Sequence, residues 1–344
     1  MSIASIVKIF GATAAASLLL IGCSSSTGGS AAGGTSTTGG SAAAAVTGTL
    51  NIDGSNTVSP IATALVELYN AENKEVEISV GSAGTGAGMG KFEKGEIEIA
   101  NASRPIKDSE IEKLAAAKID FMEIPIAHDG ICIVVNPQNE WLKNITIEQL
   151  NKIWNKDSKV KMWNEVDPSW PAEPIQLYGP TDAHGTYEFF NEVVNGDKEN
   201  VRPDYSQQAQ YDTLITSVAN EKNALGYVGF AFVEQNRDKL RVVPVNGLEP
   251  TAETILDGSY KPFSRPLFMY VSAKAFADNP AAKSFVEFAL GAKNAEAVQA
   301  AGYVPMSAEN LAAVKARVDA GKTGSIFATA AAGLSVGEVL KAAQ

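Results

Sequence analysis

The chain has 344 residues, of which 45% are hydrophobic and 19% are charged, and it contains two cysteines. Its formal net charge of −11, with no cluster of Lys or Arg, argues against nucleic acid or an anionic membrane surface as a partner. The length allows one large domain or two lobes.

The N-terminal segment has the pattern of a secretion signal. An apolar run over 9–20 follows Lys8 and is shorter than the stretch of about 20 residues that spans a membrane. A buried helix is the alternative, but no amphipathic segment follows for it to pack on. We therefore expect residues 1–22 to be a signal peptide.

A small-residue tract follows this signal. Residues 24–47 are almost entirely Ser, Thr, Gly and Ala, a composition that behaves as a flexible linker. The step Leu20-Ile21-Gly22-Cys23 resembles the lipobox of bacterial lipoproteins. That resemblance implies a lipid on Cys23, a tether over 23–47, and an exported protein held at the membrane by its anchor.

Residues 48–344 alternate short apolar runs with helical patterns, which is typical of an α/β fold. Strands are expected at 50–53, 76–80, 97–100, 131–135, 175–178, 224–228, 240–245 and 266–271. Helices are expected at 60–70, 89–94, 108–118, 146–154, 186–195, 211–220 and 280–290. Cys132 lies inside an apolar strand, so we interpret it as a small core residue rather than a nucleophile.

Three segments place Gly, Ser and Thr residues between a strand end and a helix start: residues 53–59, 81–88 and 179–186. Helix N-termini carry unpaired N–H groups and a partial positive charge, and glycines let a ligand approach the backbone. A single such loop is more typical of a capped turn. Three in one chain favour convergence on one anion.

A fourth candidate follows the strand expected at 97–100. Ser103 offers a hydroxyl, and Arg104 beside it is either a solvated surface charge or a fork that pairs with a tetrahedral anion. The neighbouring anion loops favour the second interpretation.

Nucleotide and metal patterns are absent from the sequence. Lys91 follows a glycine, but the preceding spacing and the following Phe92 break the phosphate-loop pattern. With two histidines in the chain and no cluster of metal-binding spacing, we expect no metal, no cofactor and no catalysis. A hydrolase triad of Ser103, His184 and Asp182 remains an alternative.

Six motifs together carry a family resemblance, and they are found at 52–58, 80–86, 101–106, 128–131, 224–229 and 264–267. On these residues the chain resembles the phosphate-specific substrate-binding lipoproteins of ABC importers, in the periplasmic-binding-protein superfamily. The resemblance implies a type II fold of two α/β lobes, a ligand cleft between them, and two crossing segments near 127–131 and 262–267. The first lobe would comprise 48–128 and 263–344, and the second 129–262.

The same resemblance implies inorganic phosphate as the ligand and the subunits of an ABC permease as partners. By motif, the implied contact residues are Ser55, Thr57, the amide of Val58, Ser82, Ser103, Arg104, Asp182, His184, Gly185 and Thr186. The chain departs from the family in the fourth loop, because His184 stands where a serine is expected and Asp182 is displaced by one position.

Phosphate differs from sulfate by the proton that it retains at neutral pH. A buried carboxylate that accepts this proton favours phosphate and repels sulfate. Asp182 or Asp53 is the candidate, although Asp53 is equally suited to cap its own loop. Sulfate, molybdate or arsenate as the ligand remains an alternative, and so does an adhesive or sensory lipoprotein with a vestigial cleft.

Overall fold

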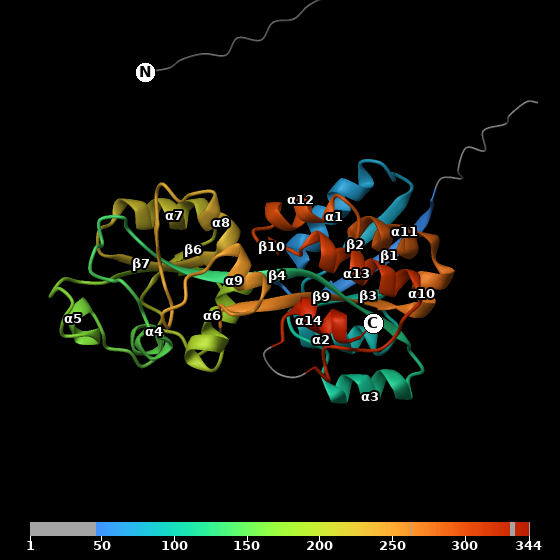
Figure 1. Cartoon of the computed structure of the whole chain (residues 1–344), viewed down its shortest axis with the longest axis horizontal. Coiled ribbons are helices and arrows are strands. Elements are labelled where there is room, and N and C mark those ends of the chain that lie inside the picture. The colour runs from blue at the N-terminus through green and yellow to red at the C-terminus, as the bar shows by residue number, and fades with distance from the viewer. Residues whose placement is uncertain (1–45, 262, 331–333, 344) are drawn as a thin grey trace, which may run out of the picture. The chain divides into compact units, whose positions relative to one another are not determined.

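The computed structural model describes residues 46–261, 263–330 and 334–343. The expected signal peptide, Cys23 and nearly all of the linker therefore lie outside the described residues. Within the described ranges the chain forms a mixed sheet flanked by helices (Figure 1). No helix in this part of the chain is long and apolar enough to cross a membrane.

The strands lie side by side in the order β2-β1-β3-β9-β4-β7-β5-β6, and both β8 and β10 pair with β4. Neighbours are parallel within β2-β1-β3 and within β7-β5-β6, and antiparallel around β9 and β4. Their bounds are β1 Gly48–Gly54, β2 Val76–Val80, β3 Ile99–Ala102, β4 Phe121–Val135, β5 Gln176–Pro180, β6 Ser206–Gln208, β7 Ala224–Gly229, β8 Arg241–Val243, β9 Ser264–Ser272 and β10 Val304–Pro305.

Most helices begin soon after the carboxyl end of a strand, which brings their N-termini to the edges of the sheet where ligands bind in α/β proteins. Their bounds are α1 Ser59–Asn70, α2 Thr85–Phe92, α3 Asp108–Ala116, α4 Ile147–Trp154, α5 Trp163–Val166, α6 Gly185–Asn195, α7 Tyr211–Asn220, α8 Phe230–Glu234, α9 Ala252–Leu256, α10 Ala273–Asp278, α11 Pro280–Ala289, α12 Asn294–Ala300, α13 Ala308–Asp319 and α14 Val336–Ala342.

Strand β4 belongs to both halves of the sheet. Its residues 121–130 pair with β9, whereas residues 131–135 pair with β7 and β8. All 15 residues of β4 are buried. Figure 1 shows β4 and β9 side by side, running from the blue and red elements toward the green and yellow ones.

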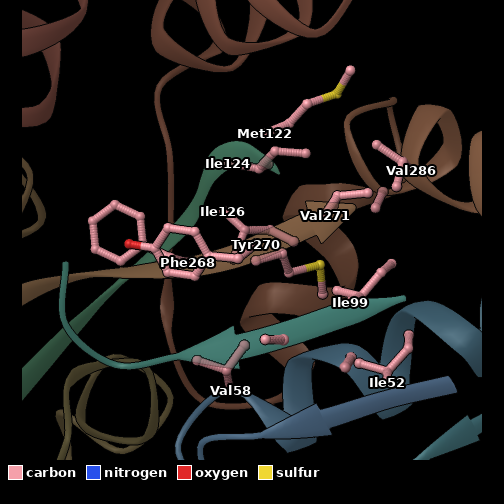
Figure 2. Close-up of a cluster of buried hydrophobic side chains, with 14 of the residues drawn as sticks. Ile52, Val58, Ile99, Met122, Ile124, Ile126, Phe268, Tyr270, Val271 and Val286 are labelled. Carbon is pink, nitrogen blue, oxygen red and sulfur yellow. The ribbon is translucent and has the colours of Figure 1, made fainter. Parts of the chain in front are cut away.

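The buried apolar side chains form two clusters. The first cluster combines residues from 50–127 with residues from 267–340, and the second combines residues from 131–263 with Val304. Figure 2 shows part of the first cluster, in which Ile52, Ile99 and Phe268 come from three strands of the sheet. Cys132 is fully buried in the second cluster, and burial raises the pKa of its thiol. The interpretation of Cys132 as a core residue is therefore confirmed.

An aromatic group in the second cluster fixes helix α6. Phe190 of α6 stacks on Tyr227 at 3.8 Å between ring centroids, and Trp154 meets Phe190 edge-on at 5.5 Å. Aromatic pairs in these geometries add to the stabilisation that burial gives. The N-terminus of α6 is thereby held against the sheet.

The sequence places one helix boundary wrongly. The segment 85–88 was expected to be loop, with a helix over 89–94, but α2 begins at Thr85 and ends at Phe92. Gly88 packs so closely on Gly54 that a Cβ at Gly88 would collide with the Gly54 backbone. Gly88 therefore meets a packing requirement and does not mark a loop.

A second displacement concerns β3, which was expected at 97–100 and is found at Ile99–Ala102. The strand extends further because Asn101 and Ala102 pair with Met269 and Phe268 of β9. Local hydrophobicity does not predict this long-range pairing.

The two clusters also meet at Gly302, which lies between α12 and β10. Gly302 has a φ of +89°, and a Cβ there would overlap the ring of Phe232 on α8. Tyr303 packs in the first cluster, whereas Phe232 packs against the second. The contact between the clusters at this point therefore requires glycine.

We predict that Gly302→Ala lowers the free energy of unfolding by about 3 kcal/mol, because it combines backbone strain with overpacking. Gly321→Ala is the matched control, since Gly321 has a φ of +63° and nothing within 4 Å of a Cβ. We expect the control to cost about 1 kcal/mol, from backbone strain alone. Urea unfolding measures both, and equal losses would contradict a tight contact at Gly302.

Candidate functional site

The first predicted loop is held firmly at the edge of the sheet. Gly54 has a φ of +136°, and a Cβ there would collide with the carbonyl oxygen of Asn101. The Ser55 N–H donates to that same oxygen at 2.9 Å, and the Val58 N–H donates to the Ser55 carbonyl at 3.1 Å. Ser55, Thr57 and Val58 are all buried. The loop is therefore preorganised at the start of α1.

Asp53 anchors this loop to the second one. Its Oδ1 accepts hydrogen bonds from the N–H groups of Gly54 at 2.7 Å and Ala83 at 3.0 Å, and its Oδ2 pairs with Lys91. Burial acts to raise the pKa of Asp53, but the bonds from Lys91, Ala83 and Gly54 outweigh it and hold the pKa below its usual value. Both carboxylate oxygens are thus engaged within the loops.

The other polar residues near these loops are less enclosed. The Ser82 side chain is exposed. Ser103 is half-buried, with its Oγ 3.3 Å from the Thr85 Oγ1. The Arg104 guanidinium makes two bonds to the Glu110 carboxylate, at 2.9 and 2.8 Å. Arg104 therefore has a carboxylate partner on α3.

Helix α6 meets the first loop from the opposite side. Gly185 at its N-terminus lies so close to Thr57 that a Cβ would overlap the Thr57 side chain and Cα. Gly185 and Thr186 are buried. The first N–H groups of a helix have no intrahelical partner and carry partial positive charge, so the N-terminus of α6 beside the first loop favours an anion.

Arg265 and Asp129 complete this site, and neither is among the contact residues predicted from the sequence. They face each other across the antiparallel strands β9 and β4. The Arg265 Nη2 is 3.2 Å from the Thr57 Oγ1 and 3.3 Å from the Asp129 Oδ2. The guanidinium also lies over the Phe189 ring at 3.8 Å. This geometry puts a fixed cation beside the first loop and α6.

Asp129 is fully buried, and its second oxygen, Oδ1, has no hydrogen-bond partner within the described residues. Burial raises the pKa of Asp129, and the charge of Arg265 only partly opposes the change. Asp129 and Arg265 lay within motifs that carried the family resemblance. Their positions on the two crossing segments were the signal that would have identified them.

The fourth loop contributes its helix end but not its carboxylate. Asp182 is exposed, and the His184 Nδ1 lies 3.2 Å from the Thr181 Oγ1. The His184 ring also meets the Tyr211 ring edge-on at 5.0 Å. A triad with Ser103 would require His184 to bond that serine, and the bonds found for His184 lead elsewhere.

The described residues include no group of three or more His, Cys, Asp or Glu side chains that would hold a metal ion. Beside the Asp129 carboxylate, the site offers hydroxyls, the N-terminus of α6 and one arginine, whose Nη1 also lies 3.9 Å from a carboxylate oxygen of Glu192. Such a donor set suits a small oxyanion.

His128 precedes Asp129 on β4 and is only 3% exposed. Its Nδ1 lacks a partner in the described part of the chain, and burial lowers its pKa from 6.5 to about 4. Between these two pH values the unfolded chain binds a proton that the folded chain does not bind. Protonation of His128 in the unfolded chain therefore lowers the free energy of unfolding as the pH falls from 6.5 toward 4. Above pH 6.5 the residue is neutral in both states and this loss is absent.

We predict that the free energy of unfolding falls by about 3 kcal/mol less in His128→Gln than in the unsubstituted protein when the pH is lowered from 6.5 to 4. Chemical denaturation across this range measures the difference. His184→Gln is the control, because His184 is the other histidine of the chain and is half-buried. It should retain the pH dependence of the unsubstituted protein. The same slope in both variants would contradict a neutral, buried His128.

The chain is similar in sequence to known binding proteins. Residues 39–293 match the family model described as a PBP superfamily domain. A phosphate-binding protein PstS from Staphylococcus haemolyticus is 42% identical over 257 residues, which cover 73% of this chain and 79% of that protein. These names describe binding proteins rather than enzymes.

Two solved structures are similar. A possible phosphate binding protein from Planctomyces limnophilus has a TM-score of 0.76 and 37% identity, and the match covers 80% of this chain and 99% of that one. A putative phosphate ABC transporter substrate-binding protein with bound phosphate, from Clostridium perfringens, has a TM-score of 0.54 and 27% identity. That match covers 76% of this chain and 100% of the other.

Proposed function

Because the chain belongs to the PBP superfamily, we propose that it binds inorganic phosphate and delivers it to the permease of an ABC importer. The observation that carries this proposal is the meeting of Thr57, Arg265 and the N-terminus of α6 at one buried point. Relatives of 42% and 37% identity that are named for phosphate binding support the choice of anion. No catalytic step is part of the proposal.

We propose that the two hydrophobic clusters are the cores of two lobes that close on the anion. The lobes would be residues 48–128 with 263–344, and residues 129–262. The crossing strands β4 and β9 connect the two clusters, which supports this division. Hinge closure of such lobes buries a ligand between them.

The proposed contact set follows from burial and from nearness to Arg265 and to the N-terminus of α6. Ser55, Thr57 and the Val58 amide would come from one lobe, and Gly185 with Thr186 from the other. Arg265 would supply the cation. Ser82 and Asp182 are exposed, so we leave them outside the inner set. Ser103, His184 and Arg104 are also left outside it, because their side-chain bonds go to Thr85, Thr181 and Glu110 and not to Thr57 or Arg265.

We further propose that the protein is exported and lipid-anchored through Cys23. The support is the sequence alone, namely the apolar run over 9–20, the lipobox-like step and the small-residue tract that follows it. The linker over 23–47 would hold the binding domain near the permease.

Titration calorimetry with the full chain tests the proposed function. We expect phosphate to bind, and sulfate, molybdate and arsenate to compete with it only weakly. A chain that releases no heat with phosphate but binds another of these oxyanions would reassign the ligand. A chain that binds none of them, and whose melting temperature none of them raises, would overturn the proposal.

We predict that Arg265→Gln weakens phosphate binding by about 30-fold or more, because truncating a buried, hydrogen-bonded charge costs at least about 2 kcal/mol. Arg104→Gln is the matched control, since it removes a guanidinium that is also paired with a carboxylate but has no bond to Thr57. We expect the control to lose less than about threefold. The opposite ranking of the two variants in calorimetry would place the cation of the site at Arg104.

We also propose that Asp129 accepts the proton that phosphate retains. Asp53 has both oxygens engaged and Asp182 is exposed, whereas Asp129 is buried and has one oxygen without a partner in the described residues. A carboxylate in this position would repel sulfate, which has no proton to donate.

We predict that Asp129→Asn reduces the ratio of phosphate affinity to sulfate affinity by at least about tenfold, the equivalent of one buried hydrogen bond. Asp182→Ala should leave this ratio unchanged. Calorimetric titration of both anions into both variants measures the ratios, and urea unfolding without ligand shows whether each variant is folded. A loss of selectivity in Asp182→Ala alone would assign the acceptor to Asp182.

A further inference from the structure

Tyr211, the first residue of α7, makes a directed contact with the proposed site. Its hydroxyl donates a hydrogen bond of 2.8 Å to the Oγ1 of Thr186, which is 2% exposed. Burial raises the pKa of Tyr211, so the phenol retains its proton at neutral pH and remains a donor. Tyr211 can therefore donate this bond, and the Thr186 hydroxyl accepts it.

This bond determines what the Thr186 hydroxyl does. A threonine hydroxyl has one proton to donate and two lone pairs that accept. Because Tyr211 occupies an acceptor position, the Thr186 proton points away from Tyr211 and is available to an acceptor. An oxyanion can only accept, so the arrangement suits an anion at the N-terminus of α6.

The Tyr211 ring is itself held from two sides. Phe232 lies against it with 4.3 Å between ring centroids, and His184 meets it edge-on at 5.0 Å. Phe232 in turn packs on Gly302, whose neighbour Tyr303 belongs to the first cluster. The tyrosine that bonds Thr186 is thus supported by a ring that contacts Gly302, next to the first cluster.

We propose that Tyr211 is a positioning residue for phosphate binding, which it promotes by orienting the Thr186 hydroxyl as a donor to the ligand. This inference rests on the proposed function, because it assigns a role within the same site. Tyr211 itself need not touch the anion. Its effect on affinity passes entirely through Thr186.

A double-mutant cycle measured by phosphate calorimetry on the full chain tests this role. Tyr211→Phe removes the hydroxyl and keeps the ring, and we expect phosphate affinity to fall about three- to tenfold. In a Thr186→Val background, Tyr211→Phe should have no further effect, because the hydroxyl that it orients is absent. In a Thr186→Ser background, which retains a hydroxyl, the loss should reappear.

Tyr69→Phe is the matched control. The Tyr69 hydroxyl bonds the Ser284 Oγ at 3.0 Å in the first cluster, so its removal deletes one buried tyrosine bond away from the site. We expect unchanged phosphate affinity in this control. Urea unfolding without ligand should give similar small losses of stability for the two Tyr→Phe variants.

The outcomes separate this inference from the proposed function. If the unsubstituted chain binds no phosphate, the proposed function fails and this inference fails with it. If that chain binds phosphate and Tyr211→Phe binds equally well, only the inference is overturned. Equal losses from Tyr211→Phe with and without the Thr186→Val substitution would also overturn it, because they indicate a general structural effect.

Discussion

The buried ion pair between Asp129 and Arg265 is the interaction on which the arrangement of the site depends. A fully buried carboxylate is costly without a partner, and truncating one member of such a pair leaves an uncompensated charge. The antiparallel register of β4 and β9 brings the two residues opposite each other. The pair thus depends on the alignment of the two strands that connect the clusters, and a shift of that register would separate its members.

Other parts of the site take their positions from this pair. Arg265 reaches Thr57 in the first loop and lies over Phe189 of α6. Gly185 then packs directly on Thr57. The Arg265 guanidinium thus contacts a loop from one cluster, a helix from the other and a crossing strand. Movement of the lobes would change these contacts of Arg265.

Much of this could be predicted from the sequence. The two-lobed α/β fold is confirmed, because alternating apolar runs and helical patterns are local signals that packing preserved. The first loop and the start of α6 are also where the sequence placed them, since Gly54 and Gly185 meet steric demands that only glycine satisfies. Features set by the backbone within a few residues were predictable.

Features set by side-chain partners distant in the chain were not. Arg265 and Asp129 are 136 residues apart, and no local pattern reveals that they pair. The partner of Arg104 is near in the chain, but Arg104 meets Glu110 because the start of α3 turns that carboxylate back toward it, which residue types alone do not reveal. The exposure of Ser82 and Asp182 likewise depends on how the loops turn, which composition does not specify.

The first cluster draws its residues from two separate stretches of the chain, which affects the order in which the cores can fold during synthesis. The second cluster uses a contiguous stretch, 131–263, apart from Val304, whereas the first needs residues near 50 and residues near 340. A chain that is synthesised from its N-terminus onward can thus form most of the second core while β1, β2 and β3 still lack β9 and the C-terminal helices. High contact order of this kind slows folding and prolongs the exposure of unpaired strands. The part of the sheet that carries the first anion loop is accordingly the last to be finished.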